Sequence, residues 1–292
     1  MFELRSDRLR VAMEGAGEEY RRSRFDWSGI ARQVILDGRH SFCAPEAYAP
    51  GSGSGGEGLM SEFGRHRQLG YASAPAGGEF ARPGIGILAK EDDRPFNCFR
   101  DYATRPFRVR LERDSARALY ISEAEPCGGY AFREEKEVSV RDNALAFRVR
   151  FINVGERAIE TEEYAHNFLC IDGRPIGEGY GLSVDYAMGF SPTPPVALSA
   201  DRTALRFTGP NAPPGFYLQT AAPAGAASHR WTLAHRPSGV RVSEEDDFEP
   251  LYFAIWGVRH VISPEVLISL EIPPGESRTW TRTYRFDSGV GE

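Results

Sequence analysis

The feature that most constrains the fold is a regular alternation of apolar and polar side chains that follows a turn at Asp142 and Asn143. Beyond that turn, one face of an extended chain carries the apolar residues Leu145, Phe147, Val149 and Phe151. The other face carries Ala146, Arg148 and Arg150. Because successive side chains of a β-strand point to opposite faces, residues 136–151 predict a hairpin with one buried and one solvated side.

Shorter runs of the same kind follow one another from Pro106 onward. They lie near residues 108–112, 117–122, 203–208, 230–234, 239–243, 251–256, 266–272 and 279–286. The 31 glycines and 20 prolines suit turns between short strands and are too many for a helical bundle. No repeat and no long helical period is visible. We therefore predict an all-β protein built as a meander of antiparallel strands.

A Gly-, Ser- and Pro-rich segment, residues 44–58, could be a mobile loop or a linker between domains. The 43 residues before it are too few for an independent core, and they contain a strand-like run at 33–36 followed by Asp37-Gly38. A loop is therefore the better interpretation, and we expect a single domain over residues 1–292.

The formal net charge of -6 and a pI near 5.7 argue against nucleic acid as a partner, because phosphate binding needs clustered Lys and Arg. A neutral or hydroxylated ligand suits this balance better. No stretch approaches the roughly 18 apolar residues of a membrane span, and the N-terminus lacks the apolar segment of a secretory signal. We expect no membrane association and a cytoplasmic protein.

The four cysteines, Cys43, Cys98, Cys127 and Cys170, are widely spaced and form no C-x-x-C pair. Free buried thiols are therefore expected, without a metal cluster. Phosphate-binding loops, zinc-protease motifs and nucleophile elbows are also missing from the sequence. Nucleotide chemistry is thus disfavoured.

His166 has the most suggestive context of the six histidines. In an extended strand Tyr164, His166 and Phe168 share one face, which places an imidazole between two aromatic rings. Such a site suits a sugar, whose C–H face packs on rings while its hydroxyls seek polar partners. A core histidine bonded to a backbone carbonyl is the alternative.

Two other clusters combine aromatic and charged residues. Residues 256–265 carry Trp256, His260 and Glu265 at the end of a predicted strand, where sandwiches place their sites. Residues 21–29 include Arg24, Asp26 and Trp27 and could bind a polyhydroxylated or anionic ligand, or form a charged edge.

The order of several short motifs resembles the aldose 1-epimerase (galactose mutarotase-like) superfamily. The motifs are Arg133–Lys136, Asp142-Asn143, Asn153-Val154-Gly155, residues 164–168, Pro274-Gly275-Glu276 and residues 283–286. The resemblance implies an antiparallel β-supersandwich that holds a sugar. It also implies a cofactor-free acid–base reaction that interconverts anomers by opening and reclosing the ring.

By the same resemblance, His166 is the catalytic acid and Glu265 the base. The substrate-binding residues expected from the resemblance and the clusters are Arg24, Asp26, Trp27, Glu62, His66, Tyr164, Asn167, Trp256 and His260. His66 lies in the region of the family's second sugar-binding histidine but lacks its surrounding motif. The expected partners are a small sugar or sugar derivative and, for the assembly, a second copy of the chain in a homodimer.

Two other functions remain open on the same fold, since a fold does not fix a function. A polysaccharide lyase would use Tyr164, His166 and either Arg24 or Arg259, and a carbohydrate-binding protein would use the pocket without catalysis. For the epimerase, we expect the His166 imidazole and the Glu265 carboxylate to face each other across a sugar at roughly 5–9 Å.

Overall fold

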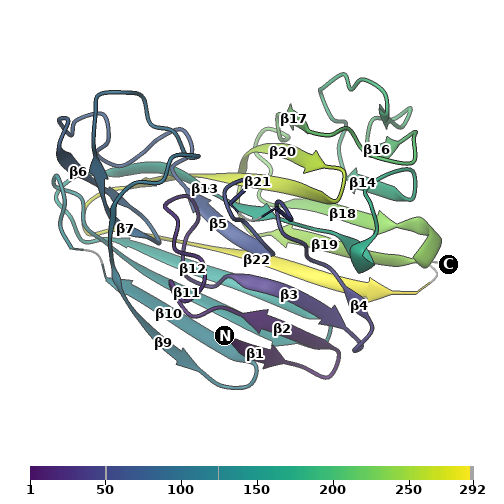
Figure 1. Cartoon of the computed structure of the whole chain (residues 1–292), viewed down its shortest axis with the longest axis horizontal. Helices are drawn as coiled ribbons and strands as arrows, with labels where there is room; N and C mark the ends of the chain where they lie inside the picture. Colours follow the sequence, from purple (N-terminus) through teal and green to yellow (C-terminus); the bar gives the residue numbers. More distant parts are fainter. Residues whose placement is uncertain (50, 124, 290–292) are drawn as a thin grey trace.

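Two large antiparallel sheets and one small sheet make up the fold (Figure 1). The computed structural model describes residues 1–49, 51–123 and 125–289. The predicted loop 44–58 and the predicted single domain 1–292 include residues 50, 124 and 290–292, which lie outside the described residues.

The first sheet runs in the order β1-β2-β3-β5-β13-β21-β20-β17, with β4 paired to β3. Its strands are β1 (Phe2–Arg5), β2 (Leu9–Met13), β3 (Ala31–Leu36), β4 (His40–Ser41), β5 (Leu59–Phe63), β13 (Ile159–Asn167), β17 (Phe216–Thr220), β20 (Pro250–Val258) and β21 (Val261–Ile272). A small sheet beside it contains β6 (Gly78–Arg82), β7 (Gly86–Lys90) and β8 (Thr104–Pro106).

The second sheet runs in the order β15-β16-β14-β18-β19-β22-β12-β11-β10-β9. Its strands are β9 (Arg108–Arg113), β10 (Arg117–Glu123), β11 (Phe132–Arg141), β12 (Ala144–Asn153), β14 (Tyr180–Val184), β15 (Val196–Leu198), β16 (Ala204–Phe207), β18 (His229–His235), β19 (Val240–Asp246) and β22 (Ser277–Ser288). Two short 3₁₀ helices, Ile171–Gly173 and Arg236–Ser238, lie in connections, and within the described ranges no helix is long and apolar enough to cross a bilayer.

The hairpin predicted from the alternating sequence is confirmed as β11 and β12. Asp142 has a positive φ of 51° at the turn, a conformation that aspartate tolerates better than most residues. The four apolar residues predicted to share a face of β12 are all buried, whereas Arg148 and Arg150 are exposed. The other predicted runs also correspond to strands, so the all-β fold class is confirmed.

The antiparallel supersandwich implied by the resemblance is confirmed, although its strands do not form one continuous meander. The chain changes between the two large sheets several times, for example from the second to the first between β12 and β13 and back between β13 and β14. Each sheet has an apolar face that must be covered, so the two sheets pack on each other instead of extending as one layer. The core between them contains residues from Leu4 to Phe286, including the fully buried Trp231 and Trp280.

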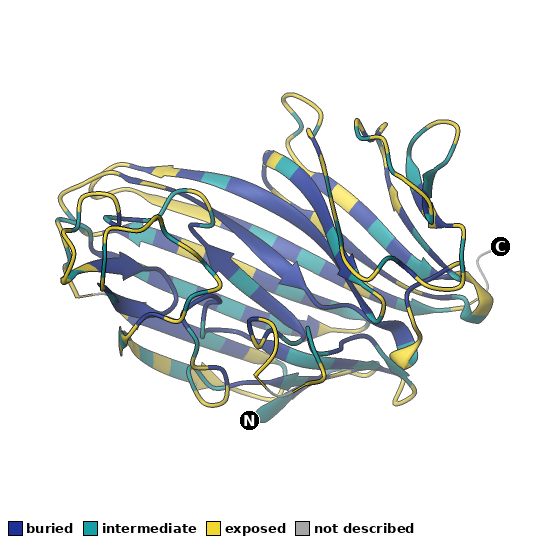
Figure 2. Ribbon diagram, turned by 45° about the horizontal axis from the view of Figure 1, so that its top comes forward, coloured by how far each residue is buried: buried dark blue, intermediate teal, exposed yellow. Residues whose placement is uncertain are grey.

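The other face of the first sheet, here called the outer face, is covered in part by loops and by the small sheet. The Asp26 amide donates to the Ser61 carbonyl, the Trp27 amide to the Gly84 carbonyl and the Ala44 amide to the Phe168 carbonyl. The central strand β13 is therefore buried on both faces, as the dark blue of the inner strands in Figure 2 shows. Buried polar groups on this strand must find protein partners or serve a ligand.

All four cysteines are free thiols, as predicted. The prediction that they are buried holds for Cys43 and Cys170 and is wrong for Cys98 and Cys127, which are half-buried.

Candidate active site

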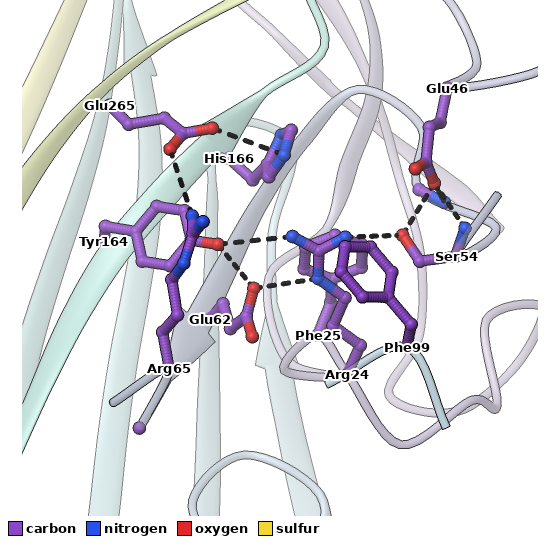
Figure 3. A network of polar contacts seen from close by, with 12 residues as sticks. Arg24, Phe25, Glu46, Ser54, Glu62, Arg65, Phe99, Tyr164, His166 and Glu265 are labelled. Carbon is purple, nitrogen blue, oxygen red and sulfur yellow. Dashed lines mark hydrogen bonds and ion pairs between the residues drawn. The ribbon is translucent and has the colours of Figure 1, made fainter. Parts of the chain in front are cut away.

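Strand β13 lies between β5 and β21 and sends alternate side chains to opposite faces. Tyr164 and His166 point to the outer face, where Figure 3 shows them beside Glu62 and Glu265. Asn167 and Glu163 point into the core, where they bond Tyr284 and Trp280 of the second sheet.

His166 lies directly across the sheet from Glu265. Tyr164 pairs with Leu267, and Leu169 with Ile262, so one constant register places residue 166 opposite residue 265. The His166 Nε2 atom is 3.3 Å from a carboxylate oxygen of Glu265, and the two side chains are 4% and 0% exposed. The expected separation of roughly 5–9 Å is therefore wrong, because adjacent strands bring opposed side chains close together.

Several atoms of this pair are buried without a hydrogen-bond partner. His166 Nδ1 and both oxygens of Glu265 have no hydrogen bond of ordinary geometry from the described residues. A buried polar atom left unpaired costs free energy, so most proteins avoid it. On the outer face of the central strand, these atoms remain available for hydrogen bonds to a ligand.

Aromatic rings surround the imidazole. Phe168 stacks on it with a centroid distance of 4.2 Å, and Trp256 and Phe25 present their edges at 5.2 and 5.5 Å. Tyr164 lies 6.0 Å away. The predicted shared face of Tyr164, His166 and Phe168 is confirmed, and the rings supply the apolar walls on which a sugar can pack.

Burial shifts the pKa of both His166 and Glu265. Loss of solvent lowers the pKa of His166 well below its ordinary value, and the cations Arg24 and Arg65 lower it further. Burial raises the pKa of Glu265 to about 7, although Arg65 and Arg24 oppose that shift. At neutral pH the imidazole is therefore neutral and the carboxyl group is close to half protonated.

A buried ion network supports the pair from the side of β5. Glu62 accepts hydrogen bonds from Arg24 Nε at 2.9 Å, from Arg82 Nη2 at 3.2 Å and from the Tyr164 hydroxyl. Arg24 also donates to Ser54 Oγ at 2.9 Å, and its guanidinium lies against the rings of Phe25 and Phe99 (Figure 3). Glu62 and Arg24 were predicted from the sequence as substrate-binding residues, and the structure places both at the Tyr164 hydroxyl.

The 44–58 loop contributes to this network. The Glu46 carboxylate accepts hydrogen bonds from the Ser54 amide and hydroxyl, both at 2.6 Å. Gly56 has no room for a side chain, since a Cβ there would lie 2.2 Å from the Phe168 ring. The loop thus closes tightly over the aromatic side of the site.

A clamp on the core side holds the two strands in register at the pair. Pro264 has no amide hydrogen and so cannot donate to the ladder between the strands. The Asn167 side chain donates to the Pro264 carbonyl at 2.7 Å. The Asn167 amide donates to Ser263 Oγ at 2.8 Å. Since Asn167 follows His166 and Pro264 precedes Glu265, these bonds fix the two catalytic candidates relative to each other.

The predicted placement of Asn167 in the substrate site is wrong. Alternation along β13 turns its side chain into the core, where it also donates to Glu244 and accepts from Tyr284. Asp26 is likewise not in the network around His166, because its carboxylate pairs with Lys136 of the second sheet. Both side chains are buried structural groups.

Three other predicted substrate-binding residues lie at the edges of the site. The Trp27 indole donates to the Arg22 carbonyl and packs between two small apolar clusters. The His66 ring bonds the Tyr252 hydroxyl at 3.1 Å, and the His260 ring bonds the Pro45 carbonyl at 3.0 Å. None of the three contacts the His166–Glu265 pair, whereas the predicted Trp256 does.

Three of the residues expected for a lyase lie together, since Tyr164 is close to both His166 and Arg24. Arg259 is exposed at the turn between β20 and β21. Burial raises the pKa of the Tyr164 hydroxyl well above its ordinary value, and Arg24 is fully engaged with Glu62, Ser54 and Tyr164. A free cation for a uronate is therefore not assembled from these residues.

Three site residues were not predicted from the sequence: Ser54, Arg65 and Arg82. Arg82 belongs to the run FARPGIGILAK. Gly84 in that run has no room for a side chain, since a Cβ there would lie 2.2 Å from Asp26, but only the structure shows this. Ser54 lies in a low-complexity loop, where nothing in the sequence distinguishes it from the neighbouring serine and glycine residues.

Comparison with known proteins identifies the fold. No protein-family model and no curated protein sequence matches the chain. Among solved structures, it resembles a candidate aldose 1-epimerase from Escherichia coli K12 at a TM-score of 0.61 and 10% identity, over 99% of both chains. The aldose epimerase homologue from C. elegans aligns at 0.59 and 8% identity, over 98% of both chains.

Galactose 1-epimerase from Lactobacillus acidophilus aligns at a TM-score of 0.54 and 14% identity, over 98% of this chain and 94% of that one. The resemblance stated from the sequence is confirmed at the level of the fold: the chain has the architecture of the aldose 1-epimerase and galactose mutarotase-like proteins.

Proposed function

We propose that this protein interconverts the anomers of an aldose or an aldose derivative. The observation that carries the proposal is the His166–Glu265 pair, buried with unpaired polar atoms among aromatic rings. The fold shared with proteins named as aldose epimerases supports it. The substrate class itself rests on chemistry, because sugars combine apolar C–H faces with polar edges.

The pair works with one shared proton. At rest the pKa values place this proton on Glu265 and leave the His166 imidazole neutral. The carboxyl group donates its proton to the ring oxygen as the bond from C1 to that oxygen breaks. The imidazole accepts the proton of the C1 hydroxyl, so that C1 becomes an aldehyde.

Ring closure reverses these transfers after rotation about the bond between C1 and C2. The aldehyde oxygen takes back a proton from the imidazolium, and the C5 hydroxyl returns one to the carboxylate as it attacks C1. The proton count of the enzyme is restored. This assignment exchanges the acid and base roles expected from the resemblance, while the two residues remain the same.

The short distance within the pair suits this reaction. The ring oxygen and the C1 hydroxyl are bonded to the same carbon, so the acid and the base must reach neighbouring atoms. Glycosidases instead place their carboxylates on opposite sides of a bond, which requires a wider separation. A contact of 3.3 Å is therefore compatible with anomer exchange at one edge of a sugar.

The proposal is tested by measuring anomer exchange for a panel of aldoses, uronates and sugar phosphates by saturation-transfer NMR. We expect exchange faster than in buffer for at least one sugar. Binding of a sugar without acceleration would favour the non-catalytic alternative. Formation of unsaturated product from a uronate polymer, seen by ultraviolet absorption, would favour a lyase.

The rate is expected to depend on pH through Glu265. Raising the pH through about 7 removes the proton from this carboxyl group and leaves the pair without one. The kcat/KM should therefore be level near pH 6 and fall by about tenfold per pH unit well above pH 7. A rate that rises through pH 7 would contradict a pair that shares one proton.

Asn167→Ala tests the clamp. The variant leaves the Pro264 carbonyl without its donor, and we expect it to lower the free energy of unfolding by roughly 1–3 kcal/mol in urea titrations. It should also lower the rate of exchange at saturating substrate, because the pair loses its alignment.

Asn143→Ala is the matched control, because Asn143 also donates two side-chain hydrogen bonds but lies at the turn between β11 and β12. Equal rates for the two variants would remove Asn167 from any positioning role.

A further inference from the structure

Arg65 follows strand β5 and turns back over the outer face. Gly64 makes this turn with a φ of 62°, and a Cβ at that position would approach the Arg67 carbonyl to 3.0 Å. The Arg65 guanidinium then lies 3.8 Å from the Glu265 carboxylate and 5.2 Å from the centre of the Tyr217 ring. Figure 3 shows it at the Glu265 oxygen that does not face His166.

The hydrogen-bonding capacity of Arg65 is unused. Within residues 1–49, 51–123 and 125–289, its guanidinium donates no hydrogen bond, and its only ion pair is the longer contact with Glu265. By contrast, all three nitrogens of Arg24 donate hydrogen bonds, and Arg82 donates to two carbonyls and to Glu62.

Of the three arginines at the site, Arg65 is also the most exposed to solvent. Its side chain is 28% exposed, whereas those of Arg24 and Arg82 are 6% and 2% exposed. A guanidinium with five free donors, held against a ring and open to solvent, is arranged to bind a planar or tetrahedral anion.

The charge of the site depends on Glu265. Among the described residues, Arg24, Arg65 and Arg82 form ion pairs with two carboxylates, Glu62 and Glu265, and a third carboxylate, Glu46, reaches Arg24 through Ser54. The site is therefore neutral when Glu265 is ionised and carries one positive charge when it is protonated. The whole chain has a formal charge of -6, so the site with Glu265 protonated has the opposite sign to the protein that carries it.

We infer that the sugar carries an anionic substituent, a carboxylate or a phosphate, and that Arg65 binds it. This inference rests on the proposed function and replaces the neutral ligand expected from the overall charge. Arg65 pairs with such a group through charge-assisted hydrogen bonds, which are shorter and stronger than neutral ones. The aldose ring then extends from Arg65 toward Glu265 and His166.

The test compares each anionic sugar with its neutral parent: glucuronate and glucose 6-phosphate with glucose, and galacturonate with galactose. We expect kcat/KM for at least one anionic sugar to exceed that of its parent by roughly 10- to 100-fold at low ionic strength, and the difference to shrink with added salt. The uronate and phosphate arms identify which anion is preferred.

Arg65→Met should bring the ratio of kcat/KM for the anionic sugar to kcat/KM for its neutral parent close to one, mainly through a higher KM for the anionic sugar. Arg65→Lys should restore part of this preference. Arg108→Met, on the outer strand β9 of the second sheet, removes the same charge far from the site in the fold and should keep the ratio. Equal kcat/KM for charged and neutral sugars in the unmodified protein would overturn the inference. A loss shared equally by both sugars in Arg65→Met would also overturn it, since Arg65 would then act only on Glu265.

Calorimetry distinguishes failure of this inference from failure of the proposed function. If no sugar exchanges its anomers faster than in buffer, binding of the same pairs is measured directly. Tighter binding of an anionic sugar that Arg65→Met abolishes would support the inference without catalysis. Equal binding, or none, would overturn it.

Discussion

Glu265→Gln and His166→Gln are each expected to lower kcat for anomer exchange by roughly 10²–10⁴-fold, the range for loss of a general acid or base. Glutamine cannot donate a carboxyl proton to the ring oxygen, and it cannot accept the proton of the C1 hydroxyl as an imidazole does. Both variants keep a side chain of similar reach at the outer face. Saturation-transfer NMR at saturating substrate measures the loss.

The matched control is Glu271→Gln, which changes an exposed glutamate on the same strand β21 and should retain full activity. Unfolding must also be excluded as the cause of a loss. Because the pKa of Glu265 is raised in the folded protein, ionisation of this group lowers stability as the pH rises through about 7. Glu265→Gln should therefore be at least as stable as the unmodified protein at pH 8, and retained exchange activity would exclude Glu265 from the reaction.

Glu62→Gln is expected to lower the free energy of unfolding by about 3–5 kcal/mol, the cost of breaking a buried ion pair from one side. The substitution leaves the guanidinium groups of Arg24 and Arg82 buried without their shared carboxylate. Urea unfolding measures the change. Glu160→Gln, at an exposed position of β13, is the control and should change stability by less than about 0.5 kcal/mol.

The loss of stability caused by Glu62→Gln should be larger at neutral pH than at acidic pH. Burial alone would raise the pKa of Glu62, but Arg24 and Arg82 overcome it and hold the pKa below the ordinary value. The stabilisation is therefore present at neutral pH and is lost as the pH falls below the usual range of a glutamate. A difference between the variant and the unmodified protein that persists unchanged at acidic pH would show that the ion network is not its source.

Alternation of side chains was enough to predict the strands, because a strand with one buried and one solvated face alternates apolar and polar residues in its own sequence. Residues 144–151 are an example, since the apolar residues of β12 face the core as expected. The order of strands was not predictable in this way. The passage from β12 to β13 changes sheets, although its turn at 153–156 resembles that of any hairpin.

The same alternation located His166 and would have excluded Asn167. Residues 166 and 167 are neighbours on one strand, so only one of them can face the site. Glu265 was identified through the resemblance, but its distance from His166 depends on the register of β13 and β21, which pairs residues a hundred positions apart.

The arginines illustrate what sequence alone could not decide. Arg24, Arg65 and Arg82 are separated by long stretches of chain, and many other arginines have similar neighbours in the sequence. Their roles differ because tertiary packing surrounds two of them with acceptors and leaves the third with only a distant carboxylate. Burial and partner geometry, not residue type, distinguish the supporting cations from the one that faces a ligand.

The most direct measurement is polarimetry of freshly dissolved α-anomers, with the native protein, the heat-unfolded protein and Glu265→Gln compared at equal concentration. We predict that the native protein brings at least one sugar of the panel to its equilibrium rotation faster than buffer does. The acceleration should disappear on unfolding and in Glu265→Gln. Relaxation at the rate of buffer for every sugar, or equal acceleration by Glu265→Gln, would contradict anomer exchange by the His166–Glu265 pair.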